Sequence, residues 1–188
     1  TTDMETDLLS QIHFALLTFL VLLFSQSLLH KRQGLLRFFG YIANYHPVFS
    51  RHSYRIAQGL ALAEALVLLM SLIPHTTLLG QSGMFALLLI YLSAIGYALI
   101  TGKTAVECGC GDTPLRVSGR LLLRNIFLLL SATGLLCLPM QTTGFLSLTA
   151  PVCAGGLLWV CYQLFEQLIL NSDLQHQLTA KSSSREGL

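Results

Sequence analysis

The stretch from Leu8 to Leu29 reads LLSQIHFALLTFLVLLFSQSLL and contains no Asp, Glu, Lys or Arg. An α-helix rises ~1.5 Å per residue, so a run of this length can cross the ~30 Å hydrocarbon core of a bilayer. The residues before it include Asp3, Glu5 and Asp7, whereas a secretory signal carries basic residues at this position. We therefore expect a transmembrane helix that is retained in the protein.

The whole composition is that of a membrane protein. Of the 188 residues, 53% are hydrophobic and 11% are charged, against roughly 25% charged residues in an ordinary soluble domain. This composition excludes a water-soluble globular enzyme. The net charge of +2 arises from Lys and Arg clustered in particular loops, so we expect no nucleic-acid partner.

Four further apolar runs are long enough to cross a membrane. With the first, they predict an all-α membrane protein: a four-helix transmembrane bundle plus a fifth C-terminal span, forming a single domain over residues 1–170. The expected spans are residues 8–29, 56–73, 84–100, 121–138 and 145–170.

Two other segments do not read as spans. Residues 35–43 form an apolar run that contains Arg37 and is too short to cross the bilayer. We expect a short interfacial helix there, after span one, ending before Pro47. Residues 171–188 are polar and offer no apolar face to bury, so we expect a disordered tail.

Basic residues orient the spans, because Lys and Arg near span ends favour the cytoplasmic side. They cluster in the first loop, the third loop and the tail, whereas the loops around residues 74–83 and 139–144 have none. With five spans, this pattern puts the N-terminus outside and the third loop inside. The basic residues counted are Lys31, Arg32, Arg37, Arg51, Arg55, Lys103, Arg116, Arg120, Lys181 and Arg185.

The third loop carries the most specific chemical feature, the sequence Cys108-Gly109-Cys110-Gly111. Two thiols one residue apart can close a small disulfide ring, and the glycines relax the backbone constraints of that ring. A strained, accessible disulfide is readily reduced by an incoming thiolate. Cys108 and Cys110 are therefore the candidate catalytic residues of a thiol–disulfide exchange site.

Two alternatives to redox chemistry remain open at these thiols. Paired thiolates also bind soft ions such as Cu(I) or Zn(II), so Cys108 and Cys110 could serve a copper or zinc carrier or transporter. A closed zinc site needs four protein ligands, and the loop contains no His. The second alternative is a non-catalytic membrane assembly subunit, in which the two cysteines form a permanent bridge.

Two more cysteines are expected near the opposite membrane face. Cys137 closes the fourth span and Cys153 opens the fifth. They are a candidate second thiol pair, although small apolar packing residues are the simpler interpretation, which also applies to Cys161 within the span.

Ionisable residues at membrane depth complete the candidate site. Glu64 lies about eight residues into the second span, and a carboxylate at that depth usually faces a partner or the bundle interior. Arg124 and Asn125 lie about one turn into the fourth span, on the side from which Glu64 also enters. We expect Glu64 to contact Arg124 or Asn125, and Arg124 to favour the thiolate form of the nearby cysteines.

The order of these features resembles the MauE family of methylamine-utilisation membrane proteins, within the DoxX-like group. The resemblance covers roughly residues 8–138 and rests on the Cys-x-Cys loop and on the Arg124-Asn125 pair that follows it, with Glu64 as support. A short stretch from Phe38-Phe39-Gly40-Tyr41 to His46-Pro47 follows the first span in the same order. One departure is Gly111-Asp112, where the family usually has Phe-Gly.

The resemblance implies a four-helix core in the bacterial inner (cytoplasmic) membrane that works with a thioredoxin-like partner. Together they would mature a disulfide-containing protein such as an amine dehydrogenase subunit, within a larger membrane assembly. Cys108 and Cys110 would be the redox pair, supported by Glu64, Arg124 and Asn125. The sequence leaves open whether a quinone serves as cofactor. A partner acting on exported proteins would place the thiol loop outside, whereas the charge pattern places it inside.

Overall fold

A computed structural model describes residues 2–33, 53–101, 119–139 and 148–186, all of them helical or in short turns. Each of the five ranges expected to span the membrane contains a helix. The short helix expected over residues 35–43 and the Cys108–Cys110 loop both lie outside the described residues. The helices are α1 (Thr2–Gln33), α4 (Ser53–Leu72), α5 (Thr77–Ile100), α6 (Gly119–Cys137) and α7 (Thr149–Glu186).

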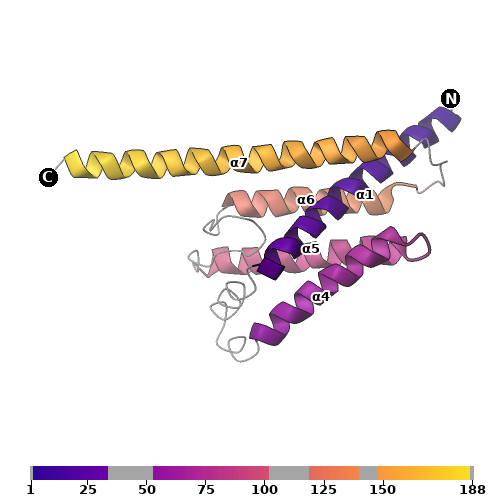
Figure 1. Cartoon of the computed structure of the whole chain (residues 1–188), viewed down its shortest axis with the longest axis horizontal. Coiled ribbons are helices and arrows are strands. Elements are labelled where there is room, and N and C mark those ends of the chain that lie inside the picture. Colours follow the sequence, from indigo (N-terminus) through magenta and orange to yellow (C-terminus); the bar gives the residue numbers. More distant parts are fainter. Residues whose placement is uncertain (1, 34–52, 102–118, 140–147, 187–188) are drawn as a thin grey trace.

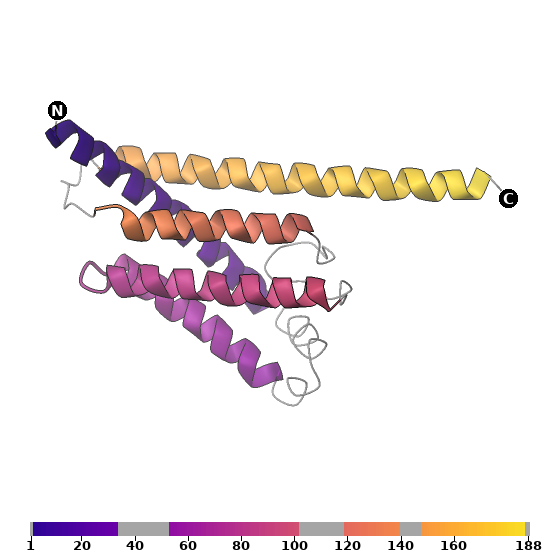
Figure 2. The same ribbon diagram turned by 180° about the vertical axis from the view of Figure 1, so that it is seen from behind.

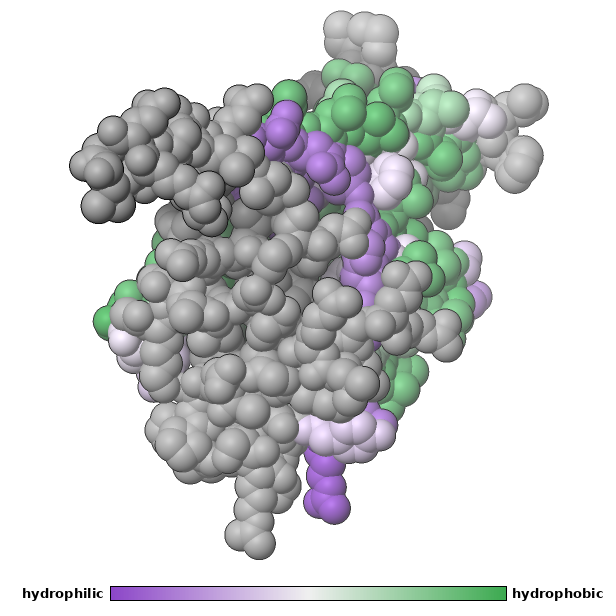
Figure 3. Space-filling model, turned by 60° about the vertical axis from the view of Figure 1, so that its left-hand side comes forward, coloured by the Kyte–Doolittle hydropathy of each residue, from purple (hydrophilic) through white to green (hydrophobic). Residues whose placement is uncertain are grey.

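Three of the described helices are long and apolar enough to cross a membrane by length and composition. The three segments are residues 6–31 of α1, residues 54–72 of α4 and the whole of α5. Helix α6 is apolar over Leu121–Cys137 but shorter. Many large hydrophobic side chains are exposed on these helices and on α7, and hydrophobic residues cover much of the described flank in Figure 3. Such a surface suits contact with lipid rather than water.

Proline sets the boundaries of several helices. Helix α4 ends just before Pro74 and α6 just before Pro139, since a proline restricts the residue before it to extended conformations. In the turn between α4 and α5, the Thr77 hydroxyl donates to the carbonyl of Ile73 at 2.8 Å. Pro151 lies in the first turn of α7, where its missing N–H has no helical acceptor to lose.

Helix α5 packs between α4 and α6, while α1 packs on α4, α6 and α7. Figures 1 and 2 show α1 crossing the other helices diagonally, with α7 along the upper edge of the bundle. The main core joins α1, α5 and α6 and excludes water from large apolar side chains. Its fully buried members are Phe19, Leu20, Phe24, Met84, Leu87, Leu88, Leu128, Ala132 and Leu135.

Two glycines permit close helix contacts. A Cβ on Gly80 would lie 2.3 Å from the backbone nitrogen of Ser71, so α4 and α5 approach backbone to backbone next to their turn. A Cβ on Gly155 would lie 2.5 Å from the carbonyl oxygen of Ala15, where α7 meets α1. Small residues of this kind let membrane helices approach closely.

The tail for which the sequence predicts disorder begins within helix α7. Helix α7 continues to Glu186 and projects beyond the other helices (Figure 1). The segment contains no proline, and its first glycine is Gly187, so no residue in it interrupts helical hydrogen bonding.

Candidate functional site

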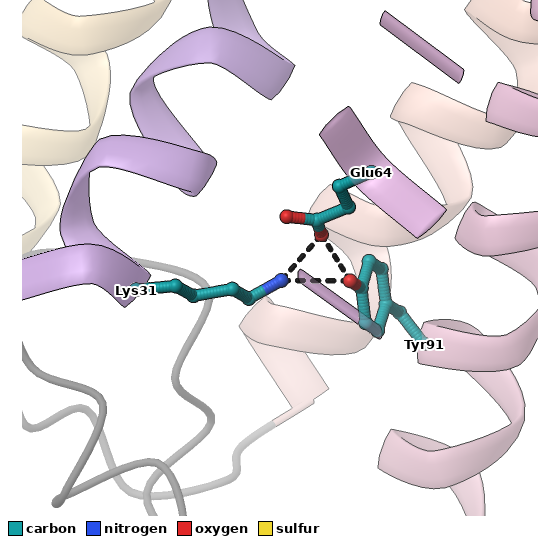
Figure 4. A network of polar contacts seen from close by, with 3 residues as sticks. All are labelled: Lys31, Glu64 and Tyr91. Carbon is teal, nitrogen blue, oxygen red and sulfur yellow. Dashed lines mark hydrogen bonds and ion pairs between the residues drawn. The ribbon is translucent and has the colours of Figure 1, made fainter. Parts of the chain in front are cut away.

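Three polar side chains from three helices meet in the interior of the protein (Figure 4). Glu64 of α4 pairs with the ammonium of Lys31, from the last turns of α1, and accepts a hydrogen bond from the hydroxyl of Tyr91 of α5. The Lys31 Nζ also donates to the Tyr91 hydroxyl at 2.7 Å and lies 4.6 Å from the centre of its ring. We call this group the Lys31–Glu64–Tyr91 cluster.

The cluster is enclosed by protein. The side chains of Lys31 and Glu64 are 0% and 1% exposed. At ~1.5 Å per residue, Glu64 lies about 16 Å from the start of α4, and Tyr91 lies about 14 Å from the end of α5. Two opposite charges removed from water are tolerated only when they bond each other and their remaining polar atoms find partners.

One oxygen of the cluster lacks such a partner. Both donors bond Glu64 Oε1, while Oε2 is buried and has no hydrogen-bond partner within the part of the chain that the structure describes. An unsatisfied buried carboxylate oxygen is costly, because the solvation lost on burial is not replaced. The cluster therefore has a free acceptor position.

The prediction that Glu64 contacts Arg124 or Asn125 is wrong. Lys31, which the charge pattern assigned to a basic loop, is the ion-pair partner instead, because its long side chain reaches inward from the end of α1. Asn125 is buried but donates to the carbonyl of Leu121, one turn earlier in α6, at 3.0 Å. The sequence signal for Lys31 was its place two residues after the first apolar run, which ends at Leu29, whereas Glu64 lies in the second run.

Arg124 forms a different ion pair, with Glu166 of α7. Its guanidinium also lies 5.8 Å from the centre of the Tyr162 ring on the same helix. The two ionic side chains are 16% and 28% exposed, so this contact lies at the edge of the bundle. Glu166 is therefore one partner of Arg124 in the described residues, and the effect of Arg124 on the thiolate form of Cys108 and Cys110 stays a prediction, because both cysteines lie outside the described residues.

A second buried polar group lies toward the opposite end of the bundle. The Nδ1–H of His13 donates to the carbonyl oxygen of Leu138 at 3.2 Å, and its Nε2 accepts a hydrogen bond from the Gln81 amide at 3.0 Å. The carbonyl can only accept, so this arrangement requires the neutral Nδ1–H tautomer. His13 thereby joins α1 to α5 and to the end of α6 in one contact.

The cysteines divide into two groups. Cys108 and Cys110 lie outside the described residues. Cys137, Cys153 and Cys161 are free thiols and are exposed, so none of them packs in the protein core, and Cys137 and Cys153 form no disulfide with each other. The described residues contain no group of three His, Cys, Asp or Glu side chains able to hold a metal ion.

The direction of the helices shows at which end of the bundle α5 ends and α6 begins. Helix α1 ends, α4 begins, α5 ends and α6 begins at one end of the bundle (Figures 1 and 2). The chain therefore leaves the described part at Thr101 and re-enters it at Gly119 on this end. Lys31 lies near the end of α1 and Tyr91 in the second half of α5, whereas Glu64 lies near the middle of α4.

These features define a multi-helix membrane protein with a buried Lys–Glu–Tyr cluster between its helices. A family model described as methylamine utilisation protein MauE matches residues 9–138, which include α4, α5, α6 and most of α1. The chain belongs to the MauE family. Helix α7 lies outside the matched range.

Two relatives carry the same description. The chain is 30% identical over 155 residues to "Methylamine utilization protein MauE" of Paracoccus versutus, covering 80% of this chain and 83% of that protein. It is 32% identical over 128 residues to the protein of the same description from Paracoccus denitrificans, covering 65% of this chain and 69% of that protein. No solved structure matches the chain significantly.

Proposed function

We propose that this protein is a membrane thiol–disulfide redox protein of methylamine utilisation, in which Cys108 and Cys110 exchange electrons with a thioredoxin-like partner. The observation that carries the proposal is the Cys-Gly-Cys sequence in the segment between α5 and α6. That segment connects the end of α5 to the start of α6. The relatives' description supplies the biological context.

The proposed arrangement in the membrane follows from the same features. Helices α1, α4, α5 and α6 form a four-helix core and α7 a fifth span, in a bacterial inner membrane and within a larger assembly. The disulfide-containing substrate is a protein such as an amine dehydrogenase subunit. Lys31 is paired with Glu64 inside the bundle, so it does not add to the positive charge of the first loop. Arg55, at the start of α4, is exposed at this end of the bundle and does add to it.

The experiment is to trap the exchange intermediate in cells. A Cys110→Ser variant leaves Cys108 free to form a mixed disulfide that its own partner cysteine cannot resolve. We expect a covalent adduct with a thioredoxin-fold protein, absent from the double variant that replaces both loop cysteines. Cys161→Ser is the matched control, because Cys161 is an exposed thiol on α7, and it should leave the adduct unchanged.

The same variants test the two alternatives. A redox pair should titrate near the potential of thioredoxin-strength dithiols, whereas a permanent structural bridge should resist them. A soft-metal site should be protected from thiol reagents by Cu(I) or Zn(II). No adduct with any single variant, together with full activity of Cys108→Ser, would refute the redox function.

A further inference from the structure

Helix α7 has an inner face on the bundle and an outer face that the other described helices leave exposed. On the inner face, Pro151 and Gly155 are buried, and the indole of Trp159 donates to the side chain of Gln26 in α1 at 3.2 Å. The opposite face carries a stripe of exposed residues along the helix. This stripe, which we call the heptad face of α7, consists of Ala150, Cys153, Leu157, Val160, Leu164 and Gln167.

The spacing of the heptad face is regular. Its members follow one another in alternating steps of three and four residues, which is the spacing of a coiled-coil seam. An ideal helix has ~3.6 residues per turn, so a stripe with a period of ~3.5 stays aligned with a second helix that crosses it at ~20°. Contact with lipid needs only an apolar surface and imposes no such period. The spacing therefore favours another helix as the partner of this face.

The same spacing continues beyond the expected span, which ends at residue 170. Helix α7 runs on to Glu186 and projects past the other helices (Figure 1), about 24 Å further at ~1.5 Å per residue. In this polar segment Leu174 and Leu178 are the only large apolar residues, and both continue the alternating steps. The a positions are Ala150, Leu157, Leu164, Asn171 and Leu178, and the d positions are Cys153, Val160, Gln167 and Leu174.

The projecting part of α7 needs a partner that lipid does not supply. Helices in proteins gain most of their stability from packing an amphipathic face rather than from helix propensity. The described part of the bundle stops short of this segment (Figures 1 and 2). A helix with the same heptad spacing would bury both leucines outside the bilayer and the apolar stripe within it.

We propose that the heptad face of α7 binds the same face of a second copy of this chain, and that the two helices form a parallel coiled coil over residues 150–178. Two copies inserted in one membrane share one orientation, so their α7 helices run in the same direction. In a symmetric pair, each residue of the face lies against its own counterpart. This pairing does not depend on the proposed redox function.

Two polar positions favour a second copy over an unrelated helix. Gln167 and Asn171 are both exposed in the single chain and occupy a d and an a position. An amide side chain both donates and accepts hydrogen bonds, so each can bond its counterpart across the pair. A single Asn at an a position is a common determinant of register and of two-stranded pairing. A second copy supplies both amides at the matching levels, whereas another helix would have to carry polar residues at the same two levels.

Disulfide cross-linking of the full-length protein in its native membranes tests the pairing. Each variant keeps one cysteine, and the others are replaced by serine. Val160→Cys puts a thiol at a d position, where the counterpart lies within the ~4.4–6.8 Å between Cα atoms that a disulfide spans. Cys161, the next residue and also exposed, is the matched control, because its e position points away from the symmetry axis. Oxidation with copper phenanthroline should join two copies through Val160→Cys and give little dimer through Cys161.

Charge substitutions beyond the span give a second measurement and leave the membrane helices unchanged. Leu174→Glu/Leu178→Glu removes the apolar contact and sets like charges against each other. Ser172→Glu/Thr179→Glu adds the same charge off the heptad face. Energy transfer between copies labelled at Cys137, an exposed thiol on α6, measures the dissociation constant in lipid vesicles. We expect the leucine variant to weaken the pair about tenfold or more, and the control to change it little.

The results decide whether a second copy occupies the heptad face. Cross-linking through Val160→Cys but not through Cys161, with energy transfer lost only in the leucine variant, supports the pairing. Equal cross-linking at the two positions indicates random collision and overturns it. The pairing is also overturned if the unmodified protein shows no energy transfer, or if the leucine variant leaves it unchanged. A covalent adduct of Val160→Cys with a different protein would make that protein the occupant and would likewise refute the proposal.

Discussion

The Lys31–Glu64 pair should be strongly coupled in the free energy of unfolding. Both side chains are essentially fully buried, so replacing one removes the opposite charge that balances the other in a low-dielectric interior. Such a loss costs roughly 3–5 kcal/mol. We therefore expect Lys31→Met and Glu64→Gln each to destabilise the protein by about this amount.

The double variant should be far less destabilised than the sum of the two single variants. Removing both charges also removes the cost of burying them, and replacing a buried ion pair by neutral residues is often close to neutral. The side-chain amide that Glu64→Gln introduces can still bond the Tyr91 hydroxyl. If the double variant is close to neutral, two single losses of roughly 3–5 kcal/mol each give a coupling free energy of roughly 6 kcal/mol or more, above the ~0.5–3 kcal/mol usual for contacting residues.

Reversible unfolding in mixed micelles of a mild detergent and dodecyl sulfate measures these free energies. The control is the same cycle on Arg124→Gln and Glu166→Gln. That pair is partly exposed, so its coupling should remain below ~1 kcal/mol. Additive effects at Lys31 and Glu64, or equal coupling in the two cycles, would refute the argument that burial decides the strength of these ion pairs.

Two further substitutions test the helix contacts. Gly155→Ala should lower the free energy of unfolding by roughly 1–3 kcal/mol, because the added Cβ would overlap the α1 backbone where α7 packs on it. The control Gly156→Ala has open space at its Cβ and should be neutral or stabilising in the same assay. His13→Ala removes the contacts with Gln81 and Leu138 and should cost about 1–3 kcal/mol through the polar groups left unpaired. The exposed His75→Ala should change little, and an equal loss in both histidine variants would contradict the structural role of His13.

The sequence by itself determined the class of the protein and the approximate positions of its helices. Long runs without charged residues, such as 8–29 and 84–100, can satisfy their backbone only as helices in a bilayer. Proline at positions 74 and 139 set two helix ends locally. The family followed from ordered local motifs, and the described helices and the family match agree with it.

Only the tertiary structure decided which polar side chains meet. Helical depth placed Glu64 inside the membrane, but many partners enter from the same side, and a depth argument cannot choose between them. The choice depends on how α1 crosses α4 and α5, and this crossing brings Lys31 to Glu64 and leaves Arg124 facing α7. A crossing angle is set by packing between residues far apart in the chain, so no local pattern in the sequence encodes it.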